Sequence, residues 1–153
     1  MGTSGKEPAD AQALAERAVA ALYAADAASQ VLGMATRSIG PGRAEVTMTV
    51  RADMVNGHGI CHGGIVFALA DSAFAFACNS GGEATVAAAA SIDYLAAARP
   101  GDELVAEAQQ LWRTRRNGLY EVVVRNQRGE RIALFRGRSW QTGAGPQPQR
   151  DAP

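Results

Sequence analysis

The fold of this chain is decided by residues 62–79, which read HGGIVFALADSAFAFACN. From Gly63 onward, apolar side chains would lie on nearly every face of a helix, which is typical of a helix surrounded by other structure. Gly81 and Gly82 follow directly and predict where the helix ends. Asp71 is the one acidic residue inside the apolar run. The sequence therefore predicts a buried helix that carries a single carboxylate.

Segments with the alternation of β-strands lie on both sides of this helix. Before it, Val46, Met48 and Val50 alternate with polar residues, the period-two pattern of a half-buried strand. After it, Asn117-Gly118 between two alternating runs is a strong hairpin signal. Because the strands do not alternate with helices, their order favours an antiparallel sheet wrapped around the helix, in the α+β class. The expected strands are residues 31–39, 43–50, 85–95, 103–112, 119–126 and 131–140, with a further helix over 11–27.

The chain has 153 residues, which fits one domain. We assign this domain to residues 11–142. Residues 1–10 are polar and rich in Gly, Ser and Pro, which predicts a disordered leader, and residues 143–153 are rich in Pro, Gln and Gly, which predicts a flexible tail.

Charge and composition exclude several partners. Lys+Arg and Asp+Glu balance at 15 each, so no overall field favours nucleic acid or a membrane surface. The most apolar segment is interrupted by Asp71 and is too short to span a bilayer. The N-terminus lacks the pattern of a secretory signal. Cys61 and Cys78 do not make a disulfide framework, and they indicate free thiols in a cytoplasmic protein.

The segment from Asn56 to Gly64 concentrates polar residues and glycines immediately before the buried helix. The first N–H groups of a helix have no internal partner, and the helix dipole favours negative charge there. A carbonyl oxygen that becomes an oxyanion suits such a place, and Gly63-Gly64 would let it approach the backbone. The alternative is that the two glycines only form a tight turn into the helix. The spacing of these residues alone does not decide between an oxyanion site and a simple turn.

Asp71 is the second unusual feature. A carboxylate in an apolar helix costs several kcal/mol unless it is hydrogen-bonded or functional, and the alternative is a thin polar face shared with Ser72 and Asn79. Gly63 and Asp71 are eight residues apart, so they lie about 12 Å apart along a helix axis. One carbonyl cannot touch both. If both serve one site, the two groups come from different subunits of a two-fold dimer with antiparallel helices.

Other chemistries fit these residues less well. His58, Cys61 and His62 suggest a metal site, but no second Cys/His cluster completes four ligands, so no metal is expected. Gly57 and Gly59 resemble the start of a dinucleotide fingerprint without its strand or its acidic residue, and no cofactor is expected. A thiol nucleophile at Cys61 would need a histidine placed by the fold rather than by adjacency in sequence.

The sequence closely resembles the PaaI-type phenylacetyl-CoA thioesterases of the hotdog superfamily. The likeness covers residues 14–142, nearly the whole domain. The runs that carry it are MVNGHGICHGG (54–64), LADSAFAFACNS (69–80), SIDYL (91–95), RPGD (99–102), GLY (118–120) and ALFRG (133–137).

This resemblance implies a hotdog fold, in which the helix lies inside a curved antiparallel sheet, and dimers that commonly pair into tetramers. It implies that Gly63 donates its N–H to the thioester carbonyl with His62 and Gly64 nearby, that Asn56 orients the thioester or water, and that Asp71 of the partner subunit acts as general base or nucleophile. The substrates it suggests are phenylacetyl-CoA and its hydroxylated forms. The resemblance does not decide whether Asp71 acts as general base or as nucleophile.

Arginine pairs well with phosphate oxygens, so the phosphates of coenzyme A have candidates in Arg113, Arg115 and Arg116, although a solvated hairpin tip is the alternative. Some relatives carry Ser or Thr in the strand opposite the acid, whereas residues 86–90 here are one valine and four alanines.

Two other functions remain as alternatives to thioester hydrolysis: hydration of an enoyl thioester, or non-catalytic binding of acyl-CoA. The acid well inside the helix favours hydrolysis over both.

Overall fold

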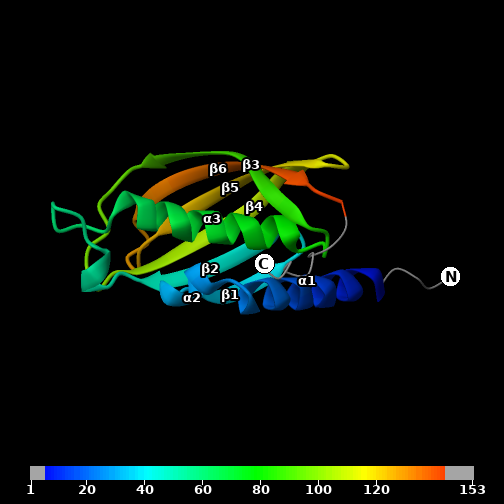
Figure 1. Ribbon diagram of the computed structural model, residues 1–153, viewed down its shortest axis with the longest axis horizontal. Helices are drawn as coiled ribbons and strands as arrows, with labels where there is room; N and C mark the ends of the chain where they lie inside the picture. Colours follow the sequence, from blue (N-terminus) through cyan, green and yellow to red (C-terminus); the bar gives the residue numbers. More distant parts are fainter. Residues whose placement is uncertain (1–5, 144–153) are drawn as a thin grey trace, which may run out of the picture.

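The computed structural model describes residues 6–143. Six antiparallel strands form one sheet in the order β1-β2-β4-β5-β6-β3. The helix α3 (Gly63–Asn79) lies across this sheet and contacts every strand of it, while α1 and α2 lie along the β1 side (Figure 1). The expected α+β arrangement, one helix wrapped by an antiparallel sheet, is confirmed. The other elements are α1 (Lys6–Ala24), α2 (Ala27–Val31), β1 (Ala35–Gly40), β2 (Arg43–Thr49), a 3-10 turn (Ala52–Met54), β3 (Thr85–Tyr94), β4 (Glu103–Arg113), β5 (Asn117–Arg125) and β6 (Arg131–Gln141).

The core lies between α3 and the sheet. Phe74 of α3 packs edge-on against Tyr120 of β5 at 5.4 Å between ring centres, and its ring centre lies 5.7 Å from that of Phe135 in β6. All three rings are buried. Burial of a large apolar side chain contributes about 1.5–3 kcal/mol, so these contacts fix how α3 lies across the sheet.

The end of α3 is joined directly to the edge strand β3. The side chain of Asn79 donates to the Thr85 carbonyl at 2.9 Å and accepts from the Thr85 N–H at 2.9 Å. This paired contact holds the start of β3 beside the last turn of α3 and leaves β3 as the outermost strand on that side of the sheet.

Two expectations at the N-terminal end are wrong. The first helix begins at Lys6, inside the expected leader, because Pro8 lies in the first turn, where its missing N–H is not needed. The expected strand over residues 31–39 begins only at Ala35. Val31 is instead the last residue of α2, a helix that Asp26 caps through the Ser29 N–H at 3.0 Å, and residues 32–34 connect it to β1. Residues 1–5 and 144–153 lie outside the described part, so the rest of the leader and nearly all of the tail are not placed.

The β4–β5 hairpin turns at Arg115-Arg116, two residues earlier than the expected Asn117-Gly118. Thr114 and Asn117 close it, with the Thr114 N–H donating to the Asn117 carbonyl at 2.7 Å, and Asn117 and Gly118 belong to β5. Gly118 serves packing rather than the turn. A Cβ there would lie 2.6 Å from the Tyr120 ring and 2.8 Å from the Ser139 hydroxyl.

Both cysteines are buried free thiols, as expected. Within residues 6–143, no helix is both long and apolar enough to cross a bilayer.

Candidate active site

The N-terminus of α3 is held by two side chains. His62 caps the helix, and its Nδ1 accepts from the Gly64 N–H at 2.9 Å. Tyr94, at the end of β3, donates from its hydroxyl to the Gly63 carbonyl at 2.8 Å. The Gly63–Gly64 peptide is therefore fixed at both its N–H and its carbonyl, and the Gly64 N–H is already occupied. Among residues 6–143, the Gly63 N–H has no acceptor, which leaves it open to a ligand oxygen.

Asn56 lies beside this helix end, in a loop that its own side chain organises. Its Oδ1 accepts from the His58 N–H at 2.9 Å, and its backbone N–H donates to the Ile60 carbonyl at 2.8 Å. With Oδ1 engaged, the side-chain NH2 is the group that Asn56 offers to a ligand. Asn56, Gly63 and Tyr94 line one pocket of about 340 Å³. The structure thus brings two of the predicted site residues together.

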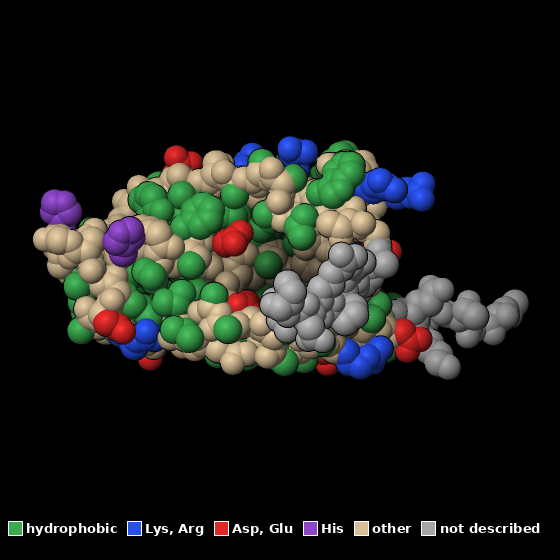
Figure 2. Space-filling view, in the orientation of Figure 1, with side chains coloured by type: hydrophobic (Ala, Val, Ile, Leu, Met, Phe, Trp, Pro, Cys, Tyr) green, Lys and Arg blue, Asp and Glu red, His purple; other side chains and the backbone are tan. Residues whose placement is uncertain are grey.

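Asp71 lies two turns further along α3, in the wall of a different and larger cavity. This cavity, of about 690 Å³, lies between α1, the second half of α3 and the start of β3, and apolar side chains form most of its wall. Figure 2 shows hydrophobic side chains gathered on the face over α3, with isolated acidic side chains among them. Burial of the Asp71 carboxylate raises its pKa above the ordinary value, and the negative charge of Asp26 raises it further.

Within one protomer, Gly63 and Asp71 do not share a cavity. Their separation of about 12 Å along α3 is too large for one thioester carbonyl to contact both. The chain therefore carries two candidate half-sites, one with an open backbone N–H and one with a half-buried carboxylate.

The three arginines lie beyond the C-terminal end of α3. Arg113 forms an ion pair with Glu83 at 2.8 Å and reaches the backbone near Gly81. Arg116 lies over the Trp140 ring at 5.9 Å from its centre. Arg115 is exposed and makes no ion pair within the described residues. None of the three lies beside Gly63 in the same protomer.

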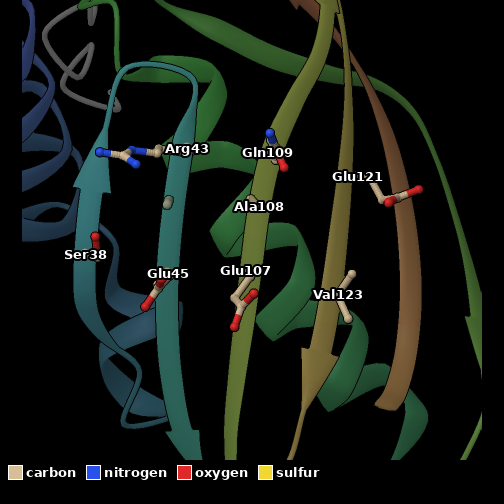
Figure 3. Close-up of a pocket in the computed structure, with 9 residues that line it drawn as sticks. Ser38, Arg43, Glu45, Glu107, Ala108, Gln109, Glu121 and Val123 are labelled. Carbon is tan, nitrogen blue, oxygen red and sulfur yellow. The ribbon is translucent and has the colours of Figure 1, made fainter. Parts of the chain in front are cut away.

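A separate hollow of about 280 Å³ lies on the face of the sheet turned away from α3 (Figure 3). Arg43, Glu45, Glu107 and Glu121 reach it from β2, β4 and β5, and none of the predicted site residues does. In residues 6–143, no three His, Cys, Asp or Glu side chains gather as a metal-binding group.

Two residues of these half-sites escaped the sequence analysis. Tyr94 reaches Gly63 across 31 residues of chain, and no local pattern signals such a contact. Asp26 is different. An aspartate directly before a short helix is the pattern of an N-cap, which could have been recognised.

Comparisons with known proteins show the family of the chain. A family model described as the thioesterase superfamily matches residues 58–133, which include the His-Gly-Gly turn and Asp71. The acyl-coenzyme A thioesterase PaaI of Escherichia coli K12 is 48% identical over 123 residues, 80% of this chain and 88% of that protein. The chain belongs to the thioesterase superfamily.

Solved structures of the superfamily share the fold. The structure of the E. coli PaaI protein superposes with a TM-score of 0.87 at 45% identity and covers 88% of this chain and 97% of that one. The structure of smu.793 from Streptococcus mutans UA159 bound to acetyl CoA gives a TM-score of 0.71 at 27% identity, over 74% of this chain and 91% of that one. The fold is thus the hotdog thioesterase fold, the PaaI-type resemblance is confirmed, and the protein is a hydrolase acting on thioester bonds.

Proposed function

We propose that this thioesterase hydrolyses acyl-CoA thioesters at a site shared by two subunits. The observation that carries the proposal is Asp71, a half-buried carboxylate in the wall of a mostly apolar cavity. Such a group at the edge of an apolar pocket suits attack on a carbonyl whose acyl chain lies in the pocket. The names of two relatives, an acyl-coenzyme A thioesterase and a structure bound to acetyl CoA, support coenzyme A as the thiol.

The second subunit completes the site through β3. This edge strand exposes most of its side chains, among them Val86 at 51% and Tyr94 at 53%. Unpaired strand edges readily pair with another chain. Antiparallel pairing of two β3 strands would set the two α3 helices antiparallel, so that Gly63 of one subunit faces Asp71 of the other. We further propose that two such dimers form a tetramer in the cytoplasm, as the resemblance implies.

In the shared site, the Gly63 N–H and the positive end of the α3 dipole stabilise the oxyanion that forms on the thioester carbonyl. The NH2 group of Asn56 orients the thioester or the attacking water. His62 acts indirectly, because its Nδ1 holds the Gly64 N–H and thereby keeps the helix terminus in place. Gly64 therefore contributes its small size rather than its N–H.

Asp71 completes the reaction by one of two routes. As a general base, its carboxylate takes a proton from water, the hydroxide attacks the carbonyl carbon, and the C–S bond breaks to release the thiolate. As a nucleophile, it attacks the carbonyl carbon, the C–S bond breaks to release the thiolate, and water then hydrolyses the resulting mixed anhydride. A single turnover in ¹⁸O-labelled water tests the nucleophile route. Label in the Asp71 carboxylate means that an anhydride formed and that water attacked its aspartyl carbon, whereas the base route leaves no label there.

The cavity beside Asp71 suits a bulky apolar acyl group. The alanines of α1 and β3 in its wall leave space that an aromatic ring can fill, so we propose aryl acyl groups such as phenylacetyl or hydroxyphenylacetyl. Of the arginines, Arg115 is the best phosphate ligand, because Arg113 is paired with Glu83 and Arg116 lies over Trp140.

Thiol release from a panel of aryl and aliphatic acyl-CoAs tests the proposal, with wild type and Asp71→Asn measured side by side. We expect aryl thioesters to react fastest and the variant to lose at least about 10²-fold in rate, the lower range for one acid–base group. An active wild type that is indifferent to Asp71→Asn would contradict the mechanism. A wild type that binds acyl-CoA without cleaving any member of the panel would contradict the function.

A further inference from the structure

A second carboxylate, Asp26, is held against α3 beside Asp71. It lies between α1 and α2, and its two oxygens accept from the backbone N–H of Ser29 at 3.0 Å and from the Ser29 hydroxyl at 2.6 Å. The Ser29 hydroxyl lies 2.8 Å from that of Ser72, the residue that follows Asp71 in α3. An ionised carboxylate only accepts, so Ser29 donates to Asp26 and Ser72 donates to Ser29.

This chain of hydrogen bonds holds the Asp26 carboxylate in a fixed position against α3. Ser29 is buried and Asp26 is half-buried, so the carboxylate is held in one place rather than moving freely in solvent. Ala25, its neighbour in sequence, lines the same cavity as Asp71. These contacts thus place a fixed anion next to the acid that the proposed reaction uses.

We propose that Asp26 is a positioning residue whose fixed negative charge sets the pH range in which the Asp71 carboxylate is active in hydrolysis. The inference rests on the proposed function. It adds a second acidic group to the site, one that touches no substrate and acts only through Asp71. In physical terms, a like charge disfavours ionisation of its neighbour.

The other ionisable groups around Asp71 do not replace Asp26 in this role. Burial raises the pKa of the Cys78 thiol to about 12, so Cys78 stays neutral in the working range. Glu83 reaches the cavity from the turn before β3, but its charge is compensated by Arg113 at 2.8 Å. Arg17 faces the cavity from α1, and a cation there acts in the opposite direction. Asp26 remains the anion that, together with burial, raises the pKa of Asp71.

The test is the pH dependence of kcat/KM for wild type and Asp26→Asn. Asparagine caps a helix about as well as aspartate, so the substitution removes the charge and retains the cap. We expect the acid limb of the profile to shift to lower pH in the variant, so that the ratio of variant to wild-type kcat/KM rises as the pH falls. Asp10→Asn, an exposed carboxylate of α1 outside the cavity, is the matched control, and its limb should superimpose on that of wild type.

A further measurement makes the outcome independent of how well the variant works. A ¹³C NMR titration of the Asp71 carboxyl should show the same downward shift without any turnover.

An Asp71 titration that is unchanged in Asp26→Asn would overturn the inference and leave Asp26 as a helix cap alone. This result leaves the proposed function standing, because thiol release tests that separately. A wild type with no thioesterase activity would instead remove the proposed function, and the NMR titration would still report whether Asp26 acts on Asp71.

Discussion

The Tyr94 hydroxyl donates to the Gly63 carbonyl at 2.8 Å, which ties the end of the edge strand β3 to the first turn of α3. The same strand forms the proposed dimer edge, and the same turn carries the proposed oxyanion donor. The position of that donor is therefore coupled to the strand through which the second subunit would pair.

Tyr94→Phe tests this coupling. The ring stays, but the Gly63 carbonyl loses a hydrogen bond, which is worth about 0.5–1.5 kcal/mol. If the loss is felt in the transition state, kcat falls by about twofold to tenfold while KM changes little. Steady-state kinetics on a good substrate measure both constants. A higher KM with unchanged kcat would mean that Tyr94 contributes to substrate binding and not to the oxyanion site.

Structural features that depend on residues close together in the sequence can be predicted from it, as two helices show. The boundaries of α3 follow from its apolar run and the glycines around it, and they are confirmed at Gly63 and Asn79. The short helix α2 is missed because Val31 and Leu32 read as the start of a strand, whereas the cap at Asp26 decides the local conformation.

The same distinction between local and long-range features applies to the candidate site. The distance between Gly63 and Asp71 follows from helix geometry and already points to a shared site. The contact of Tyr94 with Gly63 and the effect of Asp26 on Asp71 depend on how β3 and the α1–α2 loop lie against α3. Tertiary structure alone supplies such contacts, so no pattern in the sequence could have predicted them.

Leu14→Ala should alter the preference for acyl length. Leu14 lies in the wall of the cavity, with a side-chain carbon 3.3 Å from the place that a Cβ on Gly82 would take, so the two residues close one end of the cavity. Removing that side chain makes room for further carbons. Each CH2 buried contributes about 0.8 kcal/mol, or roughly fourfold in kcat/KM, for acyl chains that reach the new space.

The measurement for this prediction is kcat/KM across a series of straight-chain acyl-CoAs. Leu111→Ala is the matched control, because Leu111 is an exposed leucine of β4 outside the cavity, and its profile should equal that of wild type. An unchanged length profile in Leu14→Ala would show that the acyl group does not lie against α1.

Asp71→Asn should stabilise the fold at neutral pH. The pKa of Asp71 is raised in the folded state, so its contribution to stability is fully present below the unfolded value, about 3.9, and is lost as the pH rises through the folded value. Asparagine is neutral at every pH. The melting temperature of the variant should exceed that of wild type at pH 7, and the difference should shrink as the solution is acidified below pH ~4. A variant that melts lower than wild type at pH 7 would show that the folded protein favours the charged form.

Asp102 should behave in the opposite way. Its carboxylate is buried, accepts from the Arg99 N–H and the Gln127 side chain, both at 2.9 Å, and lies near Arg128. These contacts, the Arg99 N–H first, lower its pKa, so its contribution to stability is present above about pH 3.9 and is lost as the pH falls through the folded value.

Asp102→Asn should therefore destabilise the protein by about 1–3 kcal/mol at pH 7, measured by denaturant unfolding, with a smaller difference in acid. Thiol release by the folded variant should remain close to that of wild type, since Asp102 lies in the turn before β4 and lines neither half-site. Equal stability of the two proteins at pH 7 would show that water replaces these contacts without loss.

The shared site is the central claim, and heterodimers test it most directly. A Cβ on Gly63 would lie 3.1 Å from the Tyr94 ring, so Gly63→Val displaces the first turn of α3 and its open N–H, while Asp71→Asn removes the carboxylate. Each homodimer should therefore lose at least about 10²-fold in rate. The two variants are co-expressed with different tags, and the mixed dimer is isolated on both tags. If Gly63 and Asp71 of one site come from different subunits, one of the two sites in the mixed dimer is intact, and activity should return to about half that of wild type. A mixed dimer no more active than the two parents would mean that each site uses Gly63 and Asp71 of the same chain, which would contradict the account.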